Sequence, residues 1–282
     1  MTLMSSGAFT RCAALAFGLF STAASAQEFG HAVPNQMGLI HGATAIGEYM
    51  DWFHNALLLP IITVISLFVL GLLVYVMVKF NEKANPTPSR TTHSTVLEVA
   101  WTVIPILVLV VIAIPSFKLL NWQLTLPKAD MTIKVTGKQW FWSYDYSKEE
   151  GDFGFDALMK QEKDLKGDDK RLLAVDNEVV VPVGKVVRLQ ITSADVIHSF
   201  VLQSFGVRLD AVPGRLNETW FKAEKEGIYF GQCSKICGKD HAFMPIAFRA
   251  VSQDKYNQWR EEAKKKFAAR PSPNEFAENA AR

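Results

Sequence analysis

Two long uncharged apolar runs limit what this chain of 282 residues can fold into more than any other feature. Residues 56–78 carry no charge, and as a helix they would be about 34 Å long, enough to cross a hydrocarbon core of about 30 Å. Residues 99–117 form a second uncharged run, which contains Pro105 and Pro115. Membrane helices tolerate such prolines where neighbouring groups satisfy the freed backbone. We therefore expect a two-helix transmembrane hairpin within residues 27–122.

The charges between the two runs predict the orientation of the hairpin. Residues 79–96 contain Lys79, Lys83 and Arg90 against the single acidic residue Glu82. Loops rich in lysine and arginine stay on the cytoplasmic side, so both flanking regions should face the opposite side. We expect a multi-pass protein of a bacterial inner (plasma) membrane, with its C-terminal part in the periplasm.

The first 26 residues have the pattern of a secretory signal peptide. Arg11 precedes an apolar stretch at residues 12–20, and the Ala-Ser-Ala at residues 24–26 matches a cleavage site. A third membrane helix is the alternative, but the apolar stretch is much shorter than the roughly 20 residues that a span needs. Cleavage would remove Cys12 and leave two cysteines.

Residues 123–252 have the pattern of an all-β domain. Residues 131–136 alternate apolar and polar side chains, residues 139–146 are rich in aromatic side chains, and residues 178–192 indicate two strands joined by a turn. Further short strands are expected at residues 219–221, 228–230 and 246–251. Short strands separated by Gly and Pro favour a sandwich or a barrel.

Two polar segments accompany this domain. Residues 148–171 are rich in charge and predict an inserted loop with a short helix, and residues 253–282 predict a surface helix (roughly 253–268) with a loose tail. The formal net charge of the chain is +2, which is too balanced to indicate nucleic acid binding.

The stretch GQCSKICGKDHAFMP, residues 231–245, concentrates metal-binding side chains. Cys233, Cys237, His241 and Met244 fall within twelve residues. Thiolate, imidazole and thioether together suit copper, and they suit zinc less well because of the methionine. Two thiolates in one loop can bridge two metal ions, whereas a blue mononuclear copper site usually takes only one.

A symmetric site for two metal ions needs a second imidazole, and His198 is the candidate. It lies in the stretch DVIHSF at the end of a predicted strand, whereas the histidines other than His198 and His241 lie before or between the two apolar runs. Each ligand has a simpler alternative: the two cysteines could form a disulfide, His198 could be structural, and Met244 could pack in the core. The combined spacing CxxxCxxxHxxM favours a metal site.

The signal segment, the hairpin, the aromatic strand, DVIHSF, LDAVPGR and the cysteine loop together resemble subunit II of haem–copper oxidases of the cytochrome c oxidase type. That resemblance implies a cupredoxin-like Greek-key fold with a binuclear copper centre, CuA. Cys233 and Cys237 would bridge two copper ions. His198 and Met244 would complete one side of the centre, and His241 and the backbone carbonyl of Lys235 the other.

The same resemblance implies the function. The chain would accept electrons from cytochrome c and pass them to haem in subunit I of an aa3-type oxidase. Subunit I also holds the copper ion CuB, reduces oxygen and pumps protons. As part of that oxidoreductase and translocase, the chain would contact subunit I, subunit III and membrane lipid, with no oxygen site of its own. A quinol-oxidase-type subunit II lacks the copper ligands, and a membrane-tethered copper carrier, the other alternative, needs exposed and exchangeable ones.

Four further residues match functional positions of the family. Trp140 would be the residue at which electrons enter, although a core strand is the simpler interpretation of this stretch. Asp145 and Asp195 would be docking acids for a basic cytochrome c, or ordinary surface acids. Glu98 would lie at the entrance of a proton path in subunit I, or would be an interfacial carboxylate.

Two positions depart from the family pattern. Lys235 stands where the family usually has Glu, whose carboxylate binds Mg²⁺ at the contact with subunit I. A lysine ammonium has no acceptor, so this Mg²⁺ site is doubtful. Phe200 stands where the family often has Trp.

Overall fold

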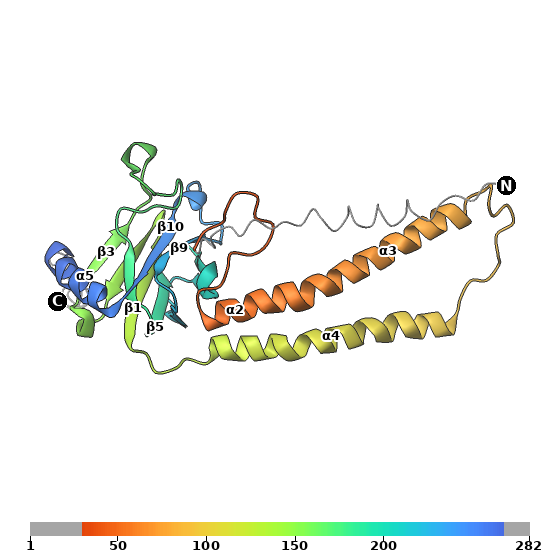
Figure 1. Cartoon of the computed structure of the whole chain (residues 1–282), viewed down its shortest axis with the longest axis horizontal. Helices are drawn as coiled ribbons and strands as arrows, with labels where there is room; N and C mark the ends of the chain where they lie inside the picture. The colour runs from red at the N-terminus through yellow and green to blue at the C-terminus, as the bar shows by residue number, and fades with distance from the viewer. Residues whose placement is uncertain (1–29, 268–282) are drawn as a thin grey trace, which may run out of the picture.

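The computed structural model describes residues 30–267 and consists of two long helical runs and one β domain (Figure 1). The fold is the predicted one, two apolar helices followed by a β-sandwich. The predicted signal peptide, residues 1–26, lies outside the described residues.

The first helical run combines three elements, α2 (Ala45–Trp52), a π-helical turn η1 (Phe53–Leu58) and α3 (Leu59–Lys79). Thr44 caps its start by accepting a hydrogen bond from the Gly47 N–H at 3.0 Å. The second run is α4 (Thr95–Leu124). In their most apolar windows the mean hydropathies of the two runs are 2.9 and 2.6, and no side chain there is buried within the chain. Helices so apolar and so exposed need a lipid or protein environment.

The two helical runs extend side by side from one end of the β domain (Figure 1). At that end the ring of Tyr49 contacts the ring of Trp122, with centroids 6.2 Å apart. Gln123 of α4 donates a hydrogen bond to the Gly206 carbonyl of the domain at 3.2 Å. Aromatic residues gathered at this level are typical of a membrane surface.

The β domain consists of two five-stranded sheets. The first has the order β3-β2-β1-β5-β8 and the second the order β4-β10-β9-β6-β7. The first sheet contains β1 (Met131–Lys138), β2 (Phe141–Tyr146), β3 (Gly154–Ala157), β5 (Val186–Ser193) and β8 (Asn217–Lys222). The second contains β4 (Val179–Pro182), β6 (His198–Leu202), β7 (Val207–Ala211), β9 (Gly227–Cys233) and β10 (Pro245–Val251).

Aromatic side chains from both sheets fill the space between them. Trp142 of β2 packs edge-on against Phe200 of β6, with centroids 5.3 Å apart, and Tyr144 packs against Phe248 of β10. Strand β1 alternates buried and partly exposed residues along its whole length, as a strand with one face on a core should. The helix α5 (Gln253–Phe267) follows β10 and buries Tyr256.

The structure differs from the sequence-based expectation in several places. His198, expected at the end of a strand, is the first residue of β6, and strand β7 was not predicted. The predicted strand 139–146 begins only at Phe141, so Trp140 lies in the turn between β1 and β2 rather than on one face with Trp142. The predicted loop 148–171 contains a strand, β3, which pairs with β2.

The residues before α2 also pack on the domain, which the sequence did not predict. Phe230 N–H donates to the Gly30 carbonyl at 2.8 Å, and Ala43 N–H donates to the Ser204 carbonyl at 2.7 Å. This N-terminal segment therefore ties the first helix to the second sheet.

Candidate metal centre

The cysteine loop connects two neighbouring antiparallel strands. Cys233 is the last residue of β9 and Pro245 is the first of β10, and Pro245 lies opposite Gln232 in the pair. Residues 241–243 form a short 3-10 turn, η5, within the loop. Because both ends of the loop are fixed by one hairpin, its ligand side chains are held over the end of the second sheet.

His198 reaches the loop from the adjacent strand. It is the first residue of β6, and in the pairing of β6 with β9, Phe200 lies opposite Cys233. The imidazole is completely buried. Sheet pairing thus brings a histidine that is 35 residues earlier in the chain to the side of the first cysteine.

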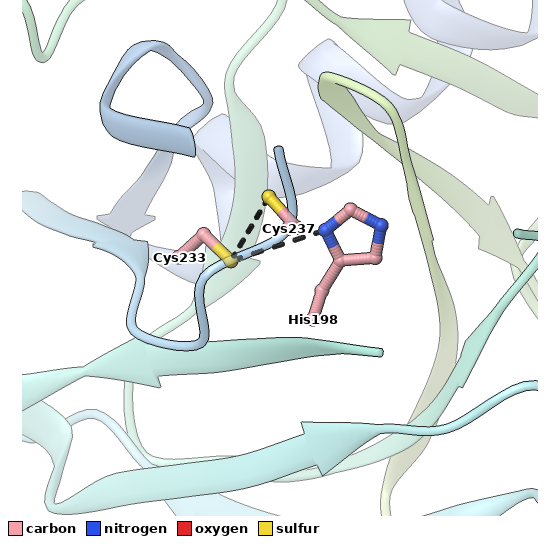
Figure 2. Close-up of side chains that lie close together, drawn as sticks. All are labelled: His198, Cys233 and Cys237. Atoms are coloured by element: carbon pink, nitrogen blue, oxygen red, sulfur yellow. Dashed lines mark hydrogen bonds between the residues drawn. The ribbon is translucent and has the colours of Figure 1, made fainter. Parts of the chain in front are cut away.

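The potential ligand atoms converge on one small region (Figure 2). The ligand atoms of His198, Cys233 and Cys237 all lie within 4.8 Å of one another. Cys233 Sγ lies 3.9 Å from His198 Nδ1, 4.0 Å from Cys237 Sγ and 3.3 Å from the Lys235 carbonyl oxygen. Cys237 Sγ lies 3.5 Å from His241 Nδ1 and 3.6 Å from Met244 Sδ.

Asp195 fixes the orientation of the His198 ring. Its Oδ1 lies 2.9 Å from His198 Nε2, and its Oδ2 accepts a hydrogen bond from the Gln139 N–H at 2.7 Å. A proton on Nε2 leaves Nδ1, the nitrogen that faces Cys233, free to bind a metal. Burial lowers the pKa of His198, but its hydrogen bonds to Cys233 and Asp195 outweigh burial and raise it.

The two thiols differ in acidity. Burial raises the pKa of Cys233, but hydrogen bonds, first of all from His198, outweigh this effect and bring the pKa down to about 6. Burial and the negative charge on Cys233 raise the pKa of Cys237 to about 12. Cys233 is therefore the more acidic thiol of the metal-free pair, and metal binding must release any proton that the two thiols still hold.

The donor set fits copper. It combines two thiols, two imidazoles, a thioether and a carbonyl oxygen, which is a soft to borderline set. Cys233, Cys237 and Met244 are buried, so bound metal would be shielded from water. The two sulfur atoms lie 4.0 Å apart, about twice the length of a disulfide bond, and both cysteines are free.

Trp140 connects the surface to the cysteine loop. Its Nε1–H donates to the Cys237 carbonyl at 3.3 Å, and the Gln139 side chain donates to the same oxygen at 2.8 Å. The ring is partly exposed, and the Lys239 ammonium lies 5.4 Å from its centroid. One hydrogen bond therefore links a partly exposed aromatic ring to the backbone of a candidate ligand residue.

Two family models match the chain. The transmembrane domain of cytochrome c oxidase subunit II matches residues 32–119, and the periplasmic domain matches residues 131–251. A probable cytochrome c oxidase subunit 2 from Rickettsia bellii is 48% identical over 261 residues, which are 93% of this chain and 95% of that protein. The cytochrome c oxidase subunit 2 of Cereibacter sphaeroides is 43% identical, covering 90% of this chain and 91% of that protein.

The chain belongs to the cytochrome c oxidase subunit II family. A solved structure, the periplasmic domain of subunit II of cytochrome oxidase from Bradyrhizobium japonicum, is also similar, with 62% identity, a TM-score of 0.48, and coverage of 51% of this chain and 99% of that one. As a member of this family, the chain is a subunit of a haem–copper oxidase, an oxidoreductase complex. It is a membrane protein with a periplasmic-type copper domain.

The structure also gives the positions of the other residues that the resemblance to subunit II suggested. Glu98 lies exposed in the first turn of α4, at the end remote from the β domain. It is 26 residues from Leu124, which corresponds to about 39 Å along the helix. Asp145 lies on β2, opposite Lys134 of β1. Asp195 lies at the centre, where its carboxylate faces His198 rather than only solvent.

Sequence reasoning missed two kinds of residue around this centre. Gln139 and the orienting role of Asp195 depend on the β1–β2 and β5–β6 turns lying together, which no local pattern encodes. Lys235 pairs with Asp210 of β7 at 3.5 Å, a contact that depends on the register of β6 and β7. The sequence offered one signal for Asp195, which is a polar residue three positions before a candidate histidine ligand.

Proposed function

We propose that this chain is the electron-transfer subunit of an aa3-type cytochrome c oxidase and that it carries a binuclear copper centre. The observation that carries the proposal is the convergence of six ligand groups, from a hairpin loop and a neighbouring strand, on one buried region. Two thiols 4.0 Å apart, flanked by an imidazole on each side, form a symmetric arrangement suited to a pair of metal ions.

The proposed ligands are the six groups already described. Cys233 and Cys237 would be shared between two copper ions, with His198 and Met244 on one side and His241 and the Lys235 carbonyl on the other. When bound, the copper pair supplies reversible one-electron transfer. The buried side chains of the domain exclude water from the centre, and Asp195 keeps the His198 ring in place. Rigid ligands suit electron transfer because little has to move when the charge of the metal changes.

The proposed electron donor is cytochrome c, and Trp140 is the proposed residue at which electrons enter. Its hydrogen bond to the Cys237 carbonyl and its partial exposure support this role. Asp145 and Asp195 stay predictions as docking acids. Since Asp195 also holds His198, its substitution needs a readout of the centre as well as of docking.

The proposed partners are subunit I, with its haem and CuB, subunit III and membrane lipid. The proposed location is a bacterial inner membrane, with the copper domain in the periplasm and Glu98 near the cytoplasmic entrance of a proton path. The doubtful Mg²⁺ site at the contact with subunit I also stays a prediction. The pairing of the Lys235 ammonium with Asp210 supports that doubt, because the side chain at this position is a cation and has no acceptor atom for Mg²⁺.

Copper counting and EPR of the purified full chain, loaded with copper in detergent, test the proposal. We expect two copper ions per chain and a seven-line hyperfine pattern, from one unpaired electron shared by both ions, and we expect Cys233→Ser to abolish it. A four-line signal with one copper would indicate a mononuclear site. Rapid exchange of the copper with a chelator would instead favour a membrane-tethered carrier.

A further inference from the structure

The tip of the cysteine loop is exposed, although the Lys235 carbonyl within it faces the centre. Ser234, Lys235 and Ile236 are exposed, and the Ile236 side chain is 87% exposed. A loop without apolar packing has few interactions that hold a carbonyl in one direction. The Lys235 carbonyl oxygen nevertheless lies 3.3 Å from Cys233 Sγ.

Two contacts attach this tip to the strand pair β6–β7. The Ser234 N–H donates to the Ser199 carbonyl at 3.0 Å, and the Lys235 Nζ lies 3.5 Å from Asp210 Oδ2. The first contact acts through the backbone N–H of Ser234, the residue before Lys235. The second acts through the Lys235 side chain itself. Together they can fix the peptide plane that carries this oxygen.

Asp210 is a well-fixed anchor for the lysine. It lies in β7, in register with Ser199 of β6, which directly follows His198. Its backbone carbonyl also accepts a hydrogen bond from the Asn217 side chain at 2.7 Å. The ion pair therefore joins Lys235, whose carbonyl faces the centre, to the strand pair β6–β7, which contains His198.

We propose that Lys235 and Asp210 are positioning residues for the metal centre. Their ion pair holds the tip of the cysteine loop against β6–β7 and keeps the Lys235 carbonyl directed at the centre. The inference rests on the proposed copper centre for its effect on metal, but the effect on the loop exists without metal. Exposed ion pairs add little to overall stability, so the expected effect is local to the loop.

The first test uses the purified full chain without metal. In amide hydrogen exchange, the peptide that contains residues 233–238 should exchange faster in Lys235→Met and in Asp210→Asn than in the original chain. Lys235→Arg, which preserves the pair, should exchange like the original. The matched control is Lys185→Met, which breaks the Lys185–Asp130 pair, whose side chains are 48% and 46% exposed against 52% and 44% for Lys235 and Asp210.

The second test uses the same variants loaded with copper. Loss of a group that orients a ligand typically costs 10- to 100-fold in metal affinity. We expect about 10-fold faster copper loss to a chelator and an altered EPR hyperfine pattern in Lys235→Met and in Asp210→Asn. The double variant should lose copper no faster than either single variant, because both break one interaction.

Three results would overturn the proposal. One is unchanged exchange of the loop in both single variants, and another is effects that add in the double variant. The third is Lys235→Arg behaving like Lys235→Met. If the original chain fails to hold a pair of copper ions, the proposed function fails, while hydrogen exchange still decides whether the ion pair positions the loop.

Discussion

Gly137 leaves the space that the His198 ring occupies. A Cβ atom at this position would lie 2.9 Å from His198 Cδ2 and 3.1 Å from Trp142 Cζ3. We expect Gly137→Ala to displace the imidazole, to speed copper loss about 10-fold and to change the EPR spectrum. Gly38→Ala, which would place its Cβ atom more than 4 Å from any neighbour, is the control and should change neither. Identical spectra for the two variants would contradict the close packing of His198 on β1.

Asp195 has two proposed roles, and one substitution separates them. In Asp195→Asn the charged acceptor for His198 Nε2–H is lost, and we expect copper retention to fall about 10-fold. Asp145→Asn, a change of the same charge at the other proposed docking acid, should leave copper retention and EPR unaltered. If both variants raise only the KM for cytochrome c and leave the centre unchanged, Asp195 is a docking residue and not an orienting one.

At the scale of elements, α5 attaches to the sandwich through a buried tyrosine. Tyr256 of α5 donates a 2.6 Å hydrogen bond to Glu150, in the turn after β2, and Tyr146 of β2 lies nearby in the same aromatic cluster. Burial raises the pKa of both tyrosines, and the Glu150 carboxylate raises that of Tyr256 further. Both side chains therefore stay neutral in the folded domain.

The buried, neutral tyrosines at this attachment should lower the stability of the folded domain at alkaline pH. Above about pH 10 the unfolded chain releases tyrosine protons that the folded domain retains, so the free energy of unfolding falls as pH rises. Each such tyrosine contributes a slope of at most about 1.4 kcal/mol per pH unit in that range. We expect urea unfolding of the β domain to show lower stability at pH 10.5 than at pH 8. Tyr256→Phe should reduce this difference, and an unchanged difference would argue against a buried neutral Tyr256.

The elements that the sequence predicted are those with strong local signals. The apolar runs predicted both helices. The clustered spacing of Cys233, Cys237 and His241 predicted a metal-binding loop, and the potential ligand atoms of these residues lie close together in the structure. Strand β3 was missed because its sequence, GFDA, is short, contains Gly and Asp, and is set by pairing with β2. The contact of Lys235 with Asp210 was missed because it depends on sheet register.

At the scale of the whole molecule, the hairpin separates two ends that differ in charge and chemistry. The connection between α3 and α4 carries Lys79, Lys83 and Arg90, whereas the candidate metal centre lies in the domain at the other end. The positive-inside rule therefore predicts that the connection and the domain face opposite sides of the membrane.

Cysteine labelling in a Cys233→Ser, Cys237→Ser background tests this orientation. Ser89 lies exposed in the connection, and Asp168 lies exposed on the domain. With a membrane-impermeant maleimide, Asp168→Cys should react in intact spheroplasts, and Ser89→Cys should react only after the cells are broken. Reaction of Ser89→Cys in intact spheroplasts would reverse the proposed orientation.

The order of strands in the second sheet has a consequence for the timing of assembly. Within residues 30–267, strand β4 joins this sheet only through β10, and β10 is the last strand in the sequence. If the domain is exported in the proposed orientation, β4 has no partner in this sheet until β10 follows, and β10 is also the strand that ends the cysteine loop. The sheet and the ligand cluster are therefore completed by the same late event. In the proposed orientation, the cysteine loop therefore stays incomplete until β10 has crossed the membrane, and the proposed copper centre could retain metal only after that step.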